Sequence, residues 1–141
     1  MSWNARRVTT AASTGDFDSD AAGTVNAGAT LTMNQIEGGS LCAEVTVDAE
    51  TSTLTLSALW QVSVDGSTWM TVANGPQNAA SVALATGTAG ADAAVTRVIP
   101  APDAVYSFKH ARCAVTNGVQ TGTTSDTYSI KYHYLKPKFL G

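Results

Sequence analysis

Alternating apolar and polar residues mark residues 53–73, which carry the clearest structural signal in this sequence. Every even position in residues 54–64 is apolar, and the odd positions there are polar except for Leu59. A period of two is typical of a β-strand with one face on a core and the other toward solvent. Asp65-Gly66 then offers a tight turn, and a second short run occupies residues 69–73. We therefore predict a β-hairpin around which the rest of the chain packs.

Similar short runs, separated by turn residues, recur along the rest of the chain. One of them changes the parity of its apolar positions near Lys109-His110, and a β-bulge there would explain the change. With about eight short strands at roughly 8–12-residue spacing and no convincing helix, the pattern predicts an all-β fold. We expect an antiparallel β-sandwich, jelly-roll-like in its connections. Besides the hairpin, the predicted strands are residues 30–33, 41–47, 81–86, 93–99, 105–116 and 127–135.

The two ends of the chain lack this pattern. Trp3 and Phe17 are the only large apolar residues in residues 1–29, where no helical or strand period fits and at most one short strand is expected, around residues 7–10. Such a segment buries too little apolar surface to order by itself, so it is mobile or laid on another surface. We predict an extended N-terminal arm over residues 1–29, the sandwich domain over residues 30–135, and a C-terminal tail over residues 136–141.

Composition narrows the possible partners. The chain has 141 residues, 13% of them charged, and a net charge of −3 with no clustered basic patch. A nucleic-acid-binding protein would carry a basic surplus, so nucleic acid is not expected as a partner. No run of eighteen apolar residues occurs, which argues against a membrane span. No signal peptide opens the chain, so we expect synthesis in the host cytoplasm.

Two cysteines stand far apart in the sequence, at Cys42 and Cys113. In a protein made in the cytoplasm both are expected to be reduced and to pack as small hydrophobic residues. A disulfide stays open as an alternative if folding places their strands side by side.

The sequence contains no recognisable catalytic or metal-binding motif. Asp16, Asp18 and Asp20 alternate as in a calcium loop, but the glycine and the glutamate that such a loop needs further on are missing. His110 and His133 lie in no nucleophile motif, and with the cysteines they show no zinc-ligand spacing. The sequence therefore predicts no catalytic residue, no metal site and no cofactor.

Aromatic residues gather in two of the predicted strands and permit two interpretations. They could form a platform on which a sugar ring stacks, or they could belong to the hydrophobic core. The core is the favoured interpretation, most of all for the first of them, because their strand neighbours are Leu, Val and Ile. The residues are Trp60, Trp69, Tyr128, Tyr132 and Tyr134.

Three segments resemble strands of small β-sandwich proteins found in tailed-bacteriophage virions. They are W-Q-V-S-V-D-G-S-T-W at residues 60–69, A-P-D-A-V-Y-S-F-K-H-A-R-C-A-V-T-N-G at residues 101–118, and D-T-Y-S-I-K-Y-H-Y-L-K-P at residues 126–137. The resemblance spans residues 54–137. It is greatest to capsid decoration (cementing) proteins and weaker to tail or fibre modules. It implies a jelly-roll-like domain in a phage particle, and no catalytic residue is carried over from that family.

These observations together predict a non-enzymatic structural virion protein. It is expected to bind the outer surface of a phage capsid and to cement neighbouring major capsid subunits, itself as a dimer or trimer. The alternative is a carbohydrate- or receptor-binding module of a phage tail or fibre. Aromatic and basic anchors at the two ends are the expected contacts, unless both termini are simply frayed. These anchors are Trp3, Arg6, Arg7, Phe17, Lys136, Lys138, Phe139 and Leu140.

Overall fold

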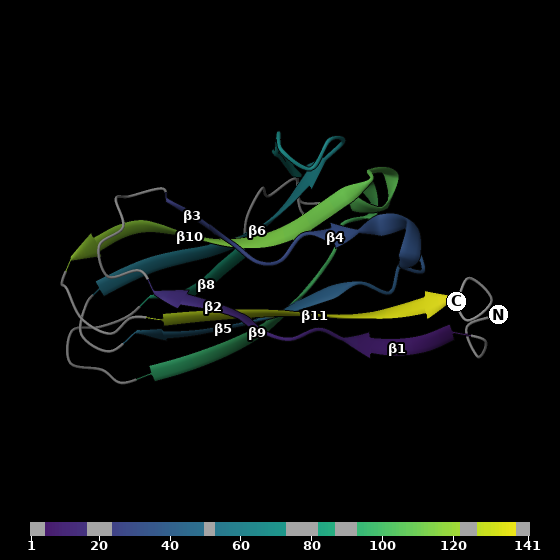
Figure 1. The fold of residues 1–141 in the computed structure, drawn as a ribbon. Coiled ribbons are helices and arrows are strands. Elements are labelled where there is room, and N and C mark those ends of the chain that lie inside the picture. Colours follow the sequence, from purple (N-terminus) through teal and green to yellow (C-terminus); the bar gives the residue numbers. More distant parts are fainter. Residues whose placement is uncertain are drawn as a thin grey trace.

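Two antiparallel β-sheets pack face to face in the computed structural model, which describes residues 5–16, 24–49, 53–72, 82–86, 93–121 and 127–137 (Figure 1). Sheet 1 has the order β1-β11-β5-β9, with β2 also paired to β11. Its strands are β1 (Ala5–Thr9), β2 (Ser13–Asp16), β5 (Cys42–Ala49), β9 (Ala93–Pro100) and β11 (Thr127–Pro137).

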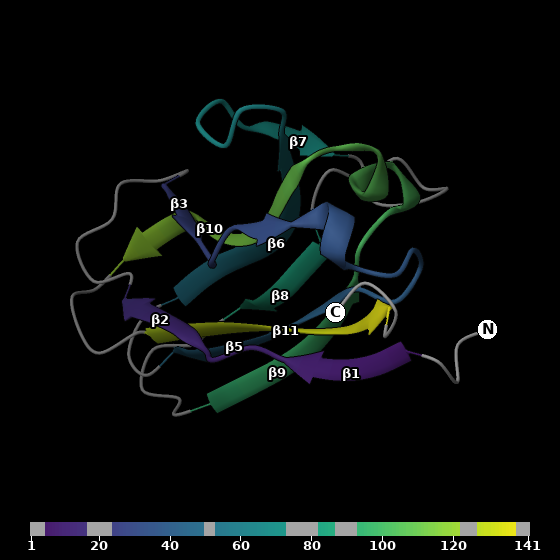
Figure 2. The same cartoon turned by 45° about the vertical axis from the view of Figure 1, so that its right-hand side comes forward.

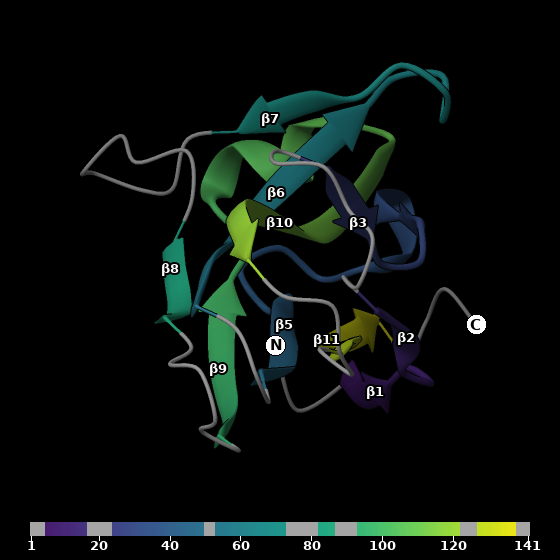
Figure 3. The same cartoon turned by 90° about the vertical axis from the view of Figure 1, so that its left-hand side faces the viewer.

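Sheet 2 has the order β3-β10-β6-β7, with β4 also paired to β10 and β8 to β6. Its strands are β3 (Val25–Ala27), β4 (Leu31–Thr32), β6 (Thr53–Ser63), β7 (Met70–Val72), β8 (Val82–Thr86) and β10 (His110–Thr121). The two layers are separate in Figure 1, and Figure 3 shows β8 and β9 on one side of the sandwich with β1 and β2 on the other.

The strand order is that of a jelly roll. β1 and β2 share one partner, as do β3 and β4, and β7 and β8, so the eleven described strands act as eight. Numbered in chain order, the eight strands form one sheet of order 1-8-3-6 and a second of order 2-7-4-5. Successive strands thus alternate between the layers, except for strands 4 and 5, which form a hairpin within one sheet; this is the double-sheet jelly-roll arrangement. The predicted all-β antiparallel sandwich, its jelly-roll character and its strand number are confirmed.

The core lies between the sheets and comes from the predicted alternation. On β6, Ala58, Trp60 and Val62 are almost completely buried, and on β5 the inward residues Ala43 and Val45 are as well. Apolar side chains at every second position of facing strands exclude water from the same layer, which is the main favourable contribution to folding. The predicted inward positions are therefore confirmed on β5 and at residues 58, 60 and 62 of β6, whereas Val64, at the end of the predicted series, is 67% exposed.

The predicted hairpin is formed by β6 and β7, whose turn is fixed by Asp65. The Asp65 Oδ1 atom accepts hydrogen bonds from the backbone N–H groups of Ser67 and Thr68, both at 2.8 Å, and from the Ser63 hydroxyl at 3.0 Å. These donors favour the charged carboxylate and lower the pKa of Asp65 to about 2, the Thr68 N–H contributing most. Gly66 takes a φ of +80°, which a glycine adopts without steric cost.

Tyr132 links the two sheets through the core. Its ring lies 5.9 Å from that of Trp60, and its hydroxyl donates to the Ala29 carbonyl at 2.8 Å. The same oxygen accepts the backbone N–H of Cys113 at 3.0 Å. β3 and β4 pair with β10 on either side of residues 28–30, which interrupt the ladder there. The hydroxyl therefore satisfies a backbone donor that strand pairing leaves open.

The N-terminal segment differs from the prediction of an arm outside the domain. β1 and β2 both pair with β11, and β3 pairs with β10, so the described residues among the first 29 belong to the two sheets. At the other end β11 continues to Pro137, past the predicted boundary at residue 135. The short strand expected around residues 7–10 corresponds to β1, whereas β2 and β3 were not predicted, because backbone hydrogen bonds to an existing sheet hold them rather than an apolar pattern of their own.

The predicted strand over residues 105–116 is wrong in its first part. Residues Asp103–Ser107 form a 3₁₀ helix, η4, and β10 begins only at His110. The change of parity near Lys109 arises from this helix, and the irregularity in the pairing of β10 lies between Asn117 and Gln120 instead. A second 3₁₀ helix, η2 (Met33–Gln35), follows β4.

Candidate functional site

The outer face of sheet 1 is a polar surface built from three neighbouring strands. On β11 the core residues Ile130 and Tyr132 alternate with Ser129, Lys131 and His133, which turn outward as predicted. The outward positions of β5 are filled by polar residues and one cysteine, namely Cys42, Glu44, Thr46 and Asp48. Side chains directly opposite on adjacent strands are about 5 Å apart, so each outward residue of β11 contacts one of β5.

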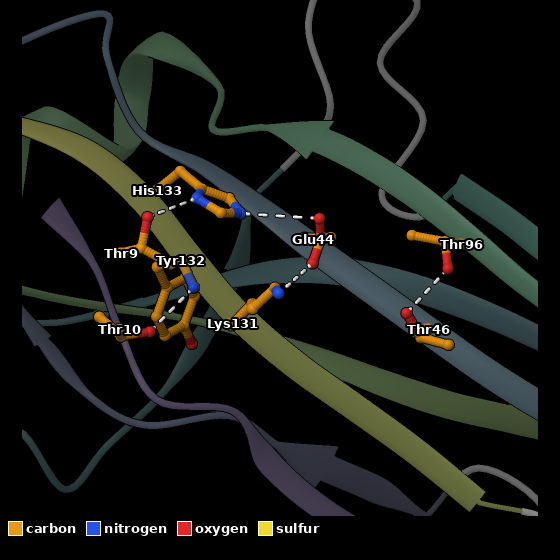
Figure 4. A network of polar contacts seen from close by, with 8 residues as sticks. All are labelled: Thr9, Thr10, Glu44, Thr46, Thr96, Lys131, Tyr132 and His133. Atoms are coloured by element: carbon orange, nitrogen blue, oxygen red, sulfur yellow. Dashed lines mark hydrogen bonds and ion pairs between the residues drawn. The ribbon is translucent and has the colours of Figure 1, made fainter. Parts of the chain in front are cut away.

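Glu44 lies at the centre of this surface, and its carboxylate contacts two residues of β11 (Figure 4). The Lys131 Nζ atom lies 2.8 Å from one carboxylate oxygen of Glu44, and the His133 Nε2 atom lies 3.8 Å from the other. The hydrogen bond from Lys131 is the main reason why the pKa of Glu44 is lowered. His133 is also held from the other side, since its Nδ1 atom is 2.9 Å from the Thr9 hydroxyl.

A shallow hollow of about 380 Å³ lies at one end of this surface, near the beginning of β11. Asp16 of β2 and Asp48 of β5 stand on either side of Thr127, each directly opposite it in the strand register. The lining includes two carboxylates and no basic residue; its members are Thr14, Gly15, Asp16, Thr46, Asp48, Thr127, Tyr128 and Ser129. Within the described residues, the Asp48 Oδ1 atom has no hydrogen-bond partner.

The other end of sheet 1 brings together basic residues from both ends of the chain. Arg6 lies opposite Lys136 and Arg7 lies opposite Leu135, because β1 pairs with the last part of β11 (Figure 2). Arg6 and Arg7 are exposed and Lys136 is half-buried. We call Arg6, Arg7 and Lys136 the terminal edge. The other predicted anchors, Trp3, Phe17, Lys138, Phe139 and Leu140, lie outside the described residues.

The five aromatic residues differ in how far they are buried. Trp60 and Tyr132 are buried between the sheets, and Tyr128 and Tyr134 pack partly buried against the same core. Trp69 directly precedes β7 and lies outside this cluster, and the Arg112 guanidinium stacks 4.1 Å from its ring centroid. The favoured core interpretation is confirmed for Trp60.

The fold separates the two cysteines from each other and the two histidines from each other, but it places Cys42 directly opposite His133 on the outer face of sheet 1. Cys113 faces the core from sheet 2, whereas Cys42 lies on the outer face of sheet 1, and both are free thiols. Burial raises the pKa of the Cys113 thiol to about 12, and it also raises the pKa of Cys42, so neither thiol is activated at neutral pH. His110 belongs to sheet 2 and His133 to sheet 1.

Among the described residues there is no group of three or more His, Cys, Asp or Glu side chains arranged to hold a metal ion. Asp18 and Asp20 of the acidic triplet lie outside the part that the structure describes. In that same part, no helix is long and apolar enough to cross a membrane.

Several residues of this surface, notably Glu44, Asp48 and Val98, were not singled out from the sequence. Their alternation with apolar neighbours was visible, and it correctly indicates one outward face for each strand. Which strands lie next to one another was not visible, so the combined surface could not be predicted.

No protein-family model and no curated protein matches this sequence. Among solved structures, a chain from the structure of infectious bursal disease virus, Gx strain, superposes on 94% of this chain with a TM-score of 0.48 and 12% sequence identity. This chain spans 33% of that chain. The superposition is too loose to support an inference about fold or function.

Proposed function

We propose that this protein is a non-enzymatic structural protein of a virion, which binds the outer surface of a phage capsid and cements neighbouring major capsid subunits. The resemblance of residues 54–137 to phage β-sandwich proteins supports this proposal. The jelly-roll strand order supports it by analogy alone, because that architecture occurs in viral capsid domains but also in lectins and cupins.

The terminal edge is the observation that carries the proposal. In a chain with a net charge of −3, it places Arg6 beside Lys136, from opposite ends of the sequence, on one face of two paired strands, while the adjacent Arg7 turns to the other face of the same edge. A basic cluster on a folded edge suits an acidic surface on another protein, and arginine is enriched among the residues that dominate interface energies.

A single contact of this kind binds too weakly to hold capsid subunits together. Each exposed ion pair contributes about 0.2–1 kcal/mol and is screened by salt, so three charges alone give weak binding. Cementing therefore depends on several simultaneous contacts to more than one capsid subunit, for which avidity supplies the remaining affinity. A rigid sandwich is suited to this because it holds the terminal edge at a fixed position.

Co-sedimentation with capsids tests the proposal. The capsids are assembled from the major capsid protein encoded by the same phage and lack this protein. Arg6→Glu combined with Lys136→Glu is expected to reduce capsid binding about tenfold or more at low salt, because like charges then face the acidic surface. Arg97→Glu is the matched control, since Arg97 is exposed on β9 at the opposite edge of sheet 1. Unchanged binding by the double variant would refute the proposal.

The alternative function, a glycan- or receptor-binding module of a tail or fibre, has less support. Two of the five aromatic residues that it would use, Trp60 and Tyr132, are in the core. Glycan binding that is lost on Trp69→Ala substitution, with the fold retained, would favour this alternative.

A further inference from the structure

On the outer face of sheet 1, negative charges lie at one end and a positive charge lies at the other end, at equal distances from a central row of residues. The central row consists of Lys131, Glu44 and Val98, which lie opposite one another on β11, β5 and β9. Four positions along β11 in one direction, Thr127 is flanked by the two aspartates of the hollow. Four positions in the other direction, Leu135 lies opposite Arg7. At about 3.4 Å per residue, each end is about 14 Å from the central row.

We propose that this face forms a two-fold symmetric dimer, in which Arg7 of each copy lies in the acidic hollow of the other copy. The inference specifies the homo-oligomer and concerns the protein alone, so it does not depend on capsid binding. Symmetric contacts of one patch with itself are the commonest basis of homodimers.

The strand register supports this symmetry. A two-fold axis that lies between the two faces and runs perpendicular to the strands reverses strand direction but keeps the order of strands. It therefore places the Thr127 end of one copy over the Leu135 end of the other. β1 and β2 both pair with β11 on the same side, so Arg7 of one copy comes to lie over Asp16 of the other. Sheets that pack face to face keep their strands within about 30° of each other, which permits this arrangement.

The chemistry of the hollow fits a guanidinium group. Its lining provides the Asp16 and Asp48 carboxylates and the hydroxyls of three threonines and one serine, all of which can accept hydrogen bonds. An arginine offers five N–H donors with a positive charge, and hydrogen bonds between ionised partners are about twice as strong as neutral ones. The Glu44 carboxylate at the centre is paired with Lys131 of the same copy, so the charges of opposite sign at the two ends are the ones that can complement each other between copies.

Val98 gives a second reason to expect a copy on this face. Its side chain is 61% exposed, and it is one of four large hydrophobic residues recorded as exposed in the described part of the chain. Val98 belongs to the central row, so the two-fold axis brings it close to Val98 of the other copy. Val98 lies on the edge strand β9, so this apolar contact stands beside the Lys131–Glu44 pair at the centre of the face.

The size of the face predicts a weak dimer. It extends about 27 Å along the strands and about 19 Å across four strands, so the contact buries about 1,000 Å² in total. Stable interfaces bury about 1,600 Å², and contacts below about 1,200 Å² are typically weak or transient. We therefore expect a dissociation constant in the micromolar range, rising with salt.

Analytical ultracentrifugation of the full chain at low salt, without capsids, tests the inference. Wild type is expected to dimerise between about 1 and 500 µM. Arg7→Asp in one variant, and Asp16→Arg with Asp48→Arg in another, are each expected to raise the dissociation constant about tenfold or more. Mixed together, the two variants are expected to form a heterodimer, because both contacts then join opposite charges. Arg97→Glu is the control and is expected to dimerise like wild type.

Three results would overturn the inference: a wild type that stays monomeric over this range, variants that dimerise as wild type does, or a mixture that gives no heterodimer. If the double arginine variant fails to fold, as judged by circular dichroism, Asp16→Asn with Asp48→Asn replaces it and is expected to weaken the dimer. The capsid test changes Arg6 and Lys136, which face away from this surface, so either proposal can fail alone.

Discussion

Replacing Tyr132 by phenylalanine tests how the two sheets are joined. The substitution keeps the ring against Trp60 and removes only the hydroxyl, which donates to the Ala29 carbonyl and accepts the Cys113 N–H. Cys113 is fully buried, so its N–H group is left without a partner and water cannot replace the hydroxyl easily. Ala29 is exposed, and its carbonyl can bind solvent instead.

The expected loss of stability comes mainly from the buried Cys113 N–H group, because the exposed Ala29 carbonyl can bind water instead. An unsatisfied buried N–H costs about 1–3 kcal/mol, and the solvated carbonyl adds little, so Tyr132→Phe should lower the free energy of unfolding by about 2 kcal/mol. With a urea slope of about 2 kcal/mol/M for a small domain, the unfolding midpoint falls by about 1 M. The melting temperature falls by about 4–8 °C for a chain of this size.

Urea unfolding followed by tryptophan fluorescence measures this difference. Tyr134→Phe is the matched control, because Tyr134 is a half-buried tyrosine of the same strand whose hydroxyl has no recorded hydrogen bond among the described residues. The control is expected to change stability by less than about 0.5 kcal/mol. If Tyr132→Phe costs no more than this control, the hydroxyl does not satisfy a buried donor and the reasoning is wrong.

Two further substitutions test other parts of the sandwich. A Cβ atom at Gly28 would lie 2.7 Å from the Tyr132 hydroxyl and 3.2 Å from the Cys113 carbonyl, so Gly28→Ala should cost about 1–3 kcal/mol by thermal unfolding, whereas Gly38→Ala, with no atom within 4 Å, should cost far less. Because the folded pKa of Asp65 is about 2, below its ordinary 3.8, its charged form stabilises the fold above about pH 4, and this contribution is lost as the pH falls toward 2. The difference in melting temperature between wild type and Asp65→Asn should therefore shrink over that interval; a constant difference would contradict the turn geometry.

The alternation of apolar and polar residues along the chain predicted most of the individual strands. The alternation in β5, β6 and β11 fixed which side chains turn inward, because successive residues of a strand point to opposite faces whatever the strand pairs with. Trp60 and its apolar neighbours were assigned to the core for the same reason. The hairpin turn followed from Asp65-Gly66, whose conformational preference is equally local.

The candidate surfaces depend instead on pairing between distant segments. Arg6, Arg7 and Lys136 were chosen from sequence, but only the pairing of β1 with β11 makes them neighbours. Asp48 and Val98 gained a role only when β5 was found between β11 and β9. Strand order depends on which backbone edges meet, and side-chain periodicity does not encode it.

The sequence by itself therefore determined a sandwich of alternating strands, the composition of its core and the absence of recognisable catalytic motifs. The tertiary structure alone decided that the described parts of the first 29 residues join the sheets, and that opposite charges lie at equal distances from one row. The physical reason is that burial is specified residue by residue, whereas backbone hydrogen bonds between strands are nearly indifferent to sequence and are selected by the whole fold.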